Sequence, residues 1–312
     1  MVRRPRSRAG IAAPRRTAVR RPSSPSTCRR PAAKQSQQVA GERAARAARS
    51  IGAIPFRGGL AVVVKNRWRA APIHLALSAM VATTIFAIAY FVWYPGAMFD
   101  AAGGRDLFLL IAGVDVTVGP LITLIIFNPR KRWLKLDLAI IGVVQLIALA
   151  YGTYVLFEAR PVWTVYVKDR YELVRANEID EAERAKAKPP FDALSITGPR
   201  LVAARLPTDP DEQFKLAISA AGGVDVQSYP RYYIPYDEAR SQVISHARPI
   251  AKLADYNPGR GAEIAALPKR FGLPESRLGF LPMRAGKQDL TVIVDKSNAD
   301  YLGTLGLKPW QY

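Results

Sequence analysis

One carboxylate lies inside a long apolar stretch of this sequence. Residues 107–127 read LFLLIAGVDVTVGPLITLIIF and contain a single charged side chain, Asp115, at the ninth position. If the stretch crosses a bilayer, a carboxylate at that depth costs at least ~2.5 kcal/mol of insertion free energy. Asp115 must therefore be protonated, hydrogen-bonded or turned toward other protein groups. A proton relay is disfavoured because a lone carboxylate provides no chain of ionisable groups.

Small residues share the predicted helix face of Asp115. Ala112 lies three positions before it and Gly119 four positions after it, so all three occupy one side of a helix. Small side chains on such a face let two membrane helices approach closely. Pro120 lacks an N–H and leaves the carbonyl of Val116 without its helical partner, which predicts a kink.

A second polar stripe follows one face of residues 136–157, which read LDLAIIGVVQLIALAYGTYVLF. Counted from the loop that joins the two stretches, Asp115 lies 12 positions from Phe127, or about 18 Å of helix. Gln145 lies nine positions from Leu136, or about 13 Å. This offset is about one helical turn and within side-chain reach. The stripe consists of Asp137, Ile141, Gln145, Ala148 and Gly152.

We therefore predict that Gln145 donates a hydrogen bond to Asp115 across an antiparallel pair of helices. Two roles remain open for this pair, a purely structural bond between helices and a surface that binds a partner. Asp137 is the second residue of its stretch, so we predict an interfacial position near Arg130 and Lys131.

Three stretches of the chain are long and apolar enough to be membrane spans. They cover residues 73–94, 107–127 and 136–157, and the first contains no Asp, Glu, Lys or Arg. At about 1.5 Å per residue, each crosses a hydrocarbon core of about 30 Å. The sequence thus predicts a membrane protein with three transmembrane α-helices over residues 73–157.

The basic residues near these spans predict the orientation. Lys65, Arg67 and Arg69 precede the first span, and residues 128–135 hold four basic residues, whereas residues 95–106 hold only Arg105. Basic residues concentrate in cytoplasmic loops. We expect a cytoplasmic N-terminus and a periplasmic domain over residues 158–312 of an inner-membrane protein.

Most of the net charge of +20 belongs to the N-terminal segment. Residues 1–72 carry 18 Lys and Arg against one acid, whereas residues 158–312 carry 22 basic and 20 acidic residues. The early residues are rich in Arg, Pro, Ser and Ala, a composition typical of disorder. We predict a disordered, Arg-rich cytoplasmic tail over residues 1–72, and no nucleic acid as a partner of the folded domain.

Residues 158–312 predict an α+β domain. Alternating or β-branched runs predict strands at 162–167, 172–174, 201–205, 279–284 and 289–294. Capping and breaker residues predict helices at 177–186, 209–221, 237–253 and 263–271. Four tyrosines over 229–236 are expected to fill the core rather than to dock a partner.

The chain contains little that could do catalysis. It has one cysteine, Cys28, and two histidines, His74 and His246, which lie far apart in the sequence. We find no HExxH, GxSxG, P-loop or GxGxxG motif. These absences favour a protein that is not an enzyme and that uses no metal or cofactor, with His246 as a packing or surface residue.

The run from Gly103 to Val174 resembles the type IV pilin accessory proteins of the TfpX/TfpZ type. The match covers the last two predicted spans and the first strand beyond them. The matching pieces are Gly103-Gly104, Gly113–Val116, Gly119–Leu121, Phe127–Pro129, Asp137-Leu138, Gln145, Ala150–Gly152, Arg160-Pro161 and Asp169-Arg170. Arg160, Pro161, Asp169 and Arg170 would then be site residues next to the membrane.

The resemblance implies a non-enzymatic inner-membrane accessory protein that assists type IV pilin stability and pilus assembly. Its partners would be pilin, a protein with one apolar membrane helix before assembly, and other membrane proteins of pilus assembly. Two alternatives remain, a membrane-anchored extracytoplasmic sensor or binding protein and a pilin-modifying membrane enzyme.

Overall fold

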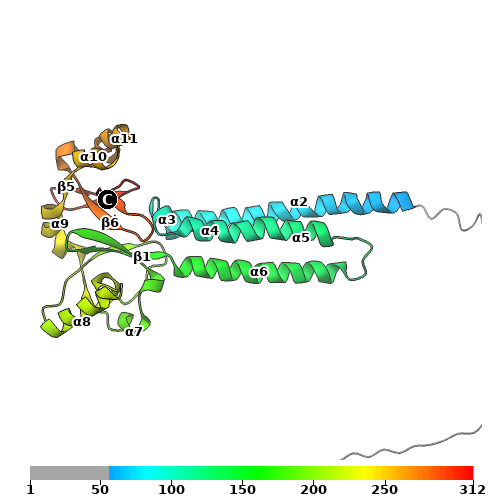
Figure 1. Ribbon diagram of the computed structural model, residues 1–312, viewed down its shortest axis with the longest axis horizontal. Coiled ribbons are helices and arrows are strands. Elements are labelled where there is room, and N and C mark those ends of the chain that lie inside the picture. The colour runs from blue at the N-terminus through cyan, green and yellow to red at the C-terminus, as the bar shows by residue number, and fades with distance from the viewer. Residues whose placement is uncertain (1–55, 312) are drawn as a thin grey trace, which may run out of the picture. The chain divides into compact units, whose positions relative to one another are not determined.

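The computed structural model describes residues 56–311, with side chains from Trp68 onward (Figure 1). Its first helix, α2 (Phe56–Ile88), continues into a π-helical turn, η1 (Ala89–Trp93). Residues 1–55 of the predicted tail, including Cys28, lie outside the described residues. The prediction of a disordered tail over residues 1–72 is wrong for residues 56–72, which form the beginning of α2. The apolar run at 60–64 favours this extension, because adding residues to an existing helix requires no new nucleation.

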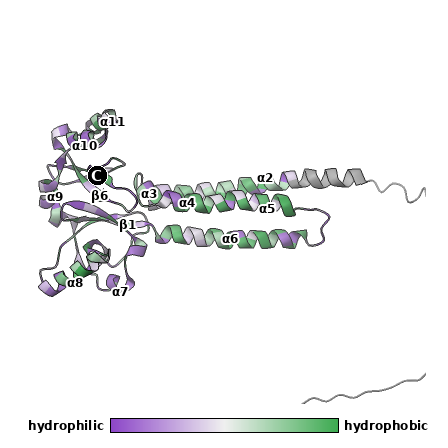
Figure 2. Cartoon of the chain, in the orientation of Figure 1, coloured by the Kyte–Doolittle hydropathy of each residue, from purple (hydrophilic) through white to green (hydrophobic). Residues whose placement is uncertain are grey.

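Two further long helices follow α2. The second comprises α4 (Gly104–Gly113), a π-helical turn η2 (Val114–Val118) and α5 (Gly119–Ile126), and it is preceded by the short α3 (Met98–Ala101). The third is α6 (Leu134–Glu158). The apolar helices Trp68–Trp93, Gly104–Ile126 and Leu134–Glu158 are each long enough to cross a membrane. Figure 2 shows that hydrophobic residues dominate α4, α5 and α6. The three predicted spans are thus present as helices.

The chain then forms a mixed sheet that combines parallel and antiparallel neighbours. Its order is β4-β3-β1-β2-β6-β7-β8, with β5 paired to β6. The pairs β1–β3 and β2–β6 are parallel and the other pairs are antiparallel. The strands are β1 (Pro161–Val167), β2 (Arg170–Arg175), β3 (Arg200–Ala204), β4 (Tyr233–Ile234), β5 (Arg248–Pro249), β6 (Leu278–Arg284), β7 (Leu290–Asp295) and β8 (Tyr301–Leu305).

The helices of this domain are short. The predicted helix over 237–253 is wrong as a single element, because α9 (Arg240–His246) ends and Arg248-Pro249 pairs with β6. Proline disfavours helical geometry in the residue before it, which explains this break. The predicted helix over 263–271 is also divided, with Pro268 in the first turn of its second piece. The helices are α7 (Glu181–Arg184), α8 (Pro210–Ala221), α9, α10 (Leu253–Tyr256), α11 (Gly261–Ala265) and α12 (Leu267–Phe271).

The largest apolar core joins the ends of the long helices to the sheet. Tyr94, Phe99 and Leu156 belong to the same buried cluster as Tyr171 and Leu281 of the sheet. The Tyr94 hydroxyl donates a hydrogen bond to the Leu156 carbonyl at 2.8 Å. The end of the first long helix is therefore fixed to the end of the third, directly beneath the sheet.

Candidate functional site

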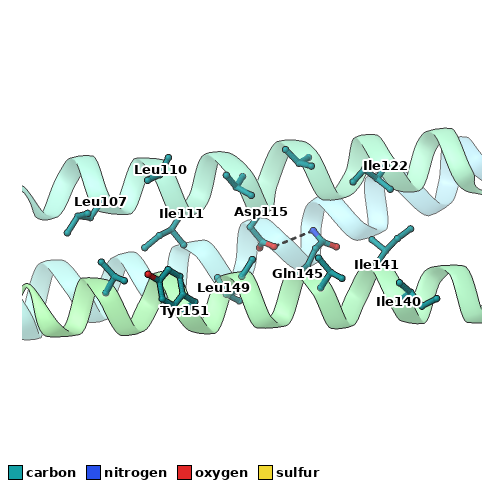
Figure 3. Close-up of a pocket in the computed structure, with 16 residues that line it drawn as sticks. Leu107, Leu110, Ile111, Asp115, Ile122, Ile140, Ile141, Gln145, Leu149 and Tyr151 are labelled. Carbon is teal, nitrogen blue, oxygen red and sulfur yellow. Dashed lines mark hydrogen bonds between the residues drawn. The ribbon is translucent and has the colours of Figure 1, made fainter. Parts of the chain in front are cut away.

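A groove runs along the helices between α4, η2 and α5 on one side and α6 on the other (Figure 3). Its volume is about 440 Å³, and its walls are almost entirely aliphatic. The polar groups that line it are the side chains of Asp115 and Gln145 and the hydroxyl of Tyr151. The wall residues include Leu107, Leu110, Ile111, Val114, Val118, Ile122, Ile140, Ile141, Val144, Ala148, Leu149, Gly152 and Val155.

Asp115 and Gln145 point toward one another across this groove (Figure 3). Gln145 Nε2 donates to Asp115 Oδ1 at 3.4 Å, so the predicted hydrogen bond is present. Gln145 Oε1 is buried and has no hydrogen-bond partner among the described residues. The pair is therefore only partly satisfied by its own contacts.

Gly119 allows the two helices to approach at the depth of the pair. A Cβ atom at this position would overlap the amide of Gln145. At Gly152 of α6, an added Cβ would lie 2.7 Å from Cγ1 of Ile111. Both glycines thus mark close backbone contacts. Ala112, which the sequence placed on the same face, is half-buried and does not line the groove.

The turn that carries Asp115 is π-helical. Pro120 has no backbone N–H to donate to the preceding turn. We predicted a kink there, and the helix widens into the π-helical turn η2 just before Pro120. The Thr117 hydroxyl donates to the Gly113 carbonyl and satisfies one backbone acceptor beside this turn. The widened turn sets the direction in which Asp115 leaves the helix.

Asp137 lies outside the groove. Its carboxylate lies 2.5 Å from Nζ of Lys131, in the loop between the second and third helices. The predicted neighbourhood of Asp137 and Lys131 is therefore present. The structure also contains a bond that sequence reasoning missed, between His74 Nδ1 on α2 and the Thr123 hydroxyl on α5, at 2.7 Å. No spacing rule links residues so far apart, so the sequence carried no signal for it.

The residues predicted next to the membrane form a separate group. Arg160 is buried and donates to the carbonyls of Ser195 and Phe157, at 3.0 and 2.7 Å. Its guanidinium lies 3.5 Å from the centroid of the Phe157 ring. These contacts lock the chain where α6 ends and Pro161 begins β1.

Asp169 and Arg170 lie at the other end of β1. Asp169 lies in the turn after β1 and Arg170 begins β2, with 3.5 Å between Arg170 Nε and an Asp169 oxygen. The structure thus does not bring these residues together with Asp115 and Gln145.

The sheet domain offers no comparable chemistry in its described part. His246 Nδ1 lies 2.9 Å from the Tyr166 hydroxyl. Tyr233 and Tyr236 are buried in the core, as predicted, whereas Tyr229 and Tyr232 are only half-buried against it. Within residues 56–311, no group of three His, Cys, Asp or Glu side chains is arranged to hold a metal ion.

The chain is similar in sequence to several known proteins. The chain is 30% identical over 229 residues to the fimbrial assembly protein of serogroup E1 from Dichelobacter nodosus, covering 72% of this chain and 89% of that protein. It is 31% identical over 229 residues to the serogroup I protein of the same organism, with the same coverage. A third relative, the protein of serogroups C1 and C2, is 39% identical over 117 residues, which are 36% of this chain and 89% of the relative.

No family model matches the chain, and no solved structure matches it. The two longer alignments nevertheless cover most of both partners at 30–31% identity. The chain therefore belongs to the family of fimbrial assembly proteins, which confirms its resemblance to the type IV pilin accessory proteins.

Proposed function

We propose that this protein is a non-enzymatic accessory factor of type IV pilus assembly that stabilises pilin in the inner membrane. Its membership of the fimbrial assembly protein family supports the role in pilus assembly. The observation that carries the mechanism is the groove between α4–α5 and α6, which is aliphatic along its walls and polar at one depth.

The groove has the chemistry of a seat for a membrane helix. Pilin has one apolar helix before assembly, and helices associate in lipid through close packing and hydrogen bonds rather than through hydrophobic burial. The wall residues leave rows of aliphatic side chains exposed on both sides of the groove, including Leu110 and Val144. A client helix in the groove would pack against both rows while the sheet domain contacts the pilin head.

The orientation proposed for this function is the one that the basic residues predict. The N-terminus and residues 128–135 would face the cytoplasm, and the sheet domain would face the periplasm. A client pilin would then meet the groove within the bilayer and the sheet domain on the outer side.

Site-specific crosslinking in living cells tests the proposal. A photoreactive residue at Val144, on the wall of the groove, should capture pilin. The matched control is Leu146, which is 65% exposed on the same helix but lies outside the groove, and it should capture mainly lipid. A strain that lacks the protein should also lose surface pili. Lipid adducts alone at Val144, or normal piliation of the deletion strain, would overturn the proposed function.

A further inference from the structure

The Asp115–Gln145 pair has hydrogen-bonding capacity that the described structure does not use. Gln145 engages one carboxyl oxygen of Asp115 through a long bond of 3.4 Å. Gln145 Oε1 is buried and has no hydrogen-bond partner among the described residues, and the hydrogen bond of the Asp115 carboxyl group is made by Oδ1 and not by its second oxygen. The pair thus presents two acceptors without donors.

No basic side chain of the groove supplies these donors. Asp115 lies 11 positions from both ends of the apolar helix Gly104–Ile126, or about 16 Å of helix in each direction. No Lys, Arg or His lines the groove. At mid-membrane depth, a polar group without a partner is costly because lipid tails cannot hydrogen-bond to it.

Two ridges of side chains flank the pair. Leu110, Val114 and Val118 follow one another at intervals of four along α4 and η2, and their side chains are 68%, 47% and 44% exposed. Ile140 and Val144 have the same spacing on α6, where they are 54% and 59% exposed. Rows at this spacing are the ridges that helices use when they pack against each other. The groove therefore presents a helix-shaped surface around two acceptors.

Taking the proposed function as given, we propose that the Asp115–Gln145 pair selects a membrane helix that carries a hydrogen-bond donor side chain at mid-membrane depth. A hydroxyl or amide donor on that helix would satisfy the free oxygen of Asp115 while the aliphatic ridges pack around it. A lipid is the less fitting occupant, because acyl chains carry no donor and the headgroups lie about half a bilayer away. The ridges thus provide packing, and the polar pair provides specificity.

Model helices of Leu and Ala provide the test. The full-length protein in bicelles would be titrated with fluorescent helices that carry one Asn at mid-depth, one Asn two turns nearer either end, or Leu throughout. We expect the mid-depth Asn helix to bind about three- to tenfold more tightly than the all-Leu helix, since one hydrogen bond between membrane helices contributes about 1 kcal/mol. The displaced Asn helices should bind like the all-Leu helix.

Variants of the pair identify its contribution. The preference for mid-depth Asn should disappear when Asp115→Leu and Gln145→Leu are combined. Asp115→Asn retains a carbonyl acceptor of the same shape and should keep a preference. Leu146→Ala changes a residue outside the groove and should keep the full preference.

Two results would overturn the inference: equal binding of the mid-depth Asn and all-Leu helices by the unmodified protein, or an unchanged preference in the double Leu variant. Crosslinking separates such a failure from failure of the proposed function. If Val144 still captures pilin when no donor preference exists, the donor inference is wrong and the accessory role stands. If Val144 captures no pilin at all, the accessory role itself is wrong.

Discussion

At the scale of single residues, the absence of a side chain at Gly119 determines where the polar pair can lie. Gln145 reaches Asp115 because its amide lies against the bare backbone of Gly119. Gly142, on α6, is different, since a Cβ there would meet no atom within 4 Å. The two helical glycines therefore provide a matched comparison.

The first prediction concerns these two glycines. Gly119→Ala should destabilise the protein by about 1–3 kcal/mol, because the new methyl group forces Gln145 away and overpacks the helix contact. Gly142→Ala should be neutral or slightly stabilising, since Ala favours helix and meets no neighbour. Thermal unfolding of the purified protein in detergent measures both. Equal effects of the two substitutions would contradict the close packing at Gly119.

The second prediction concerns the pH dependence of stability through Glu172 on β2. Burial raises the pKa of Glu172 from its ordinary value of 4.5 to about 7, although Arg284 and Arg170 oppose the shift. Its folded-state pKa exceeds its unfolded-state pKa, so the folded state binds the proton more tightly. The contribution of Glu172 to stability should therefore be greatest below pH 4.5 and fall, by on the order of 3 kcal/mol, as the pH rises to 7.

Unfolding temperatures between pH 4.5 and 8 measure this slope. Glu172→Gln keeps a neutral side chain at every pH and should flatten the dependence. Glu181→Gln removes an exposed carboxylate from α7 and should leave the slope as it is. A slope that persists unchanged in Glu172→Gln would assign the pH dependence to other groups.

At the scale of elements, local signals in the sequence predicted the structure wherever one residue type determines a start or a stop. Asp209 and Gly222 bound α8 as predicted, and the side chain of Asp209 accepts hydrogen bonds from two backbone amides of the first turn. The strands predicted at 162–167 and 172–174 are both present, and they pair with each other across a tight turn. The three long apolar helices were predictable because their composition leaves few alternatives.

The errors arose where tertiary contacts outweigh local preference. Arg248-Pro249 lies within the helix predicted over 237–253 but forms a short strand, because β6 offers it an edge. β8 was not predicted, since its sequence YLGTL contains a glycine and becomes a strand only beside β7. In the groove, polarity and depth predicted the Asp115–Gln145 bond, but nothing local indicated the free Gln145 oxygen or the bond between His74 and Thr123.

The third prediction tests the capping of α8. Asp209→Ala should lower the free energy of unfolding by about 1 kcal/mol, because two amides of the first turn lose their acceptor. Asp211→Ala, two residues later in the first turn, removes a charge but not the cap and should have a smaller effect. Chemical denaturation monitored by tryptophan fluorescence can compare the two. An equal loss in both variants would mean that charge, rather than the cap, stabilises this helix end.

At the scale of the whole molecule, the described helices and the sheet are joined by one core and by polar contacts. Lys287 donates its backbone N–H to the Ala101 carbonyl at 2.9 Å, and its ammonium pairs with Asp106. This links the loop before β7 to the connection between the first and second long helices. The two long helices and the sheet thus meet at one end of the helical region.

The fourth prediction concerns the membrane topology. A reporter that is active only outside the cytoplasm should be active when it is fused after Tyr312 and inactive when it is inserted in residues 128–135. A cytoplasmic fluorescent reporter should give the opposite pattern. Replacing the basic residues of 128–135 with neutral ones should weaken this asymmetry, because basic residues retain a loop in the cytoplasm. Cytoplasmic activity of the Tyr312 fusion would overturn the proposed orientation.

The shared core has a practical consequence for anyone who wants to study the sheet domain as a soluble fragment. Met98 and Phe99 of α3 are buried in the same cluster as strand residues such as Tyr171 and Leu281. A fragment that starts after Glu158 would lack these side chains and would expose the apolar face of the sheet that they cover. Such a fragment should precipitate unless a grafted 95–106 loop, or an amphiphile, covers that apolar face.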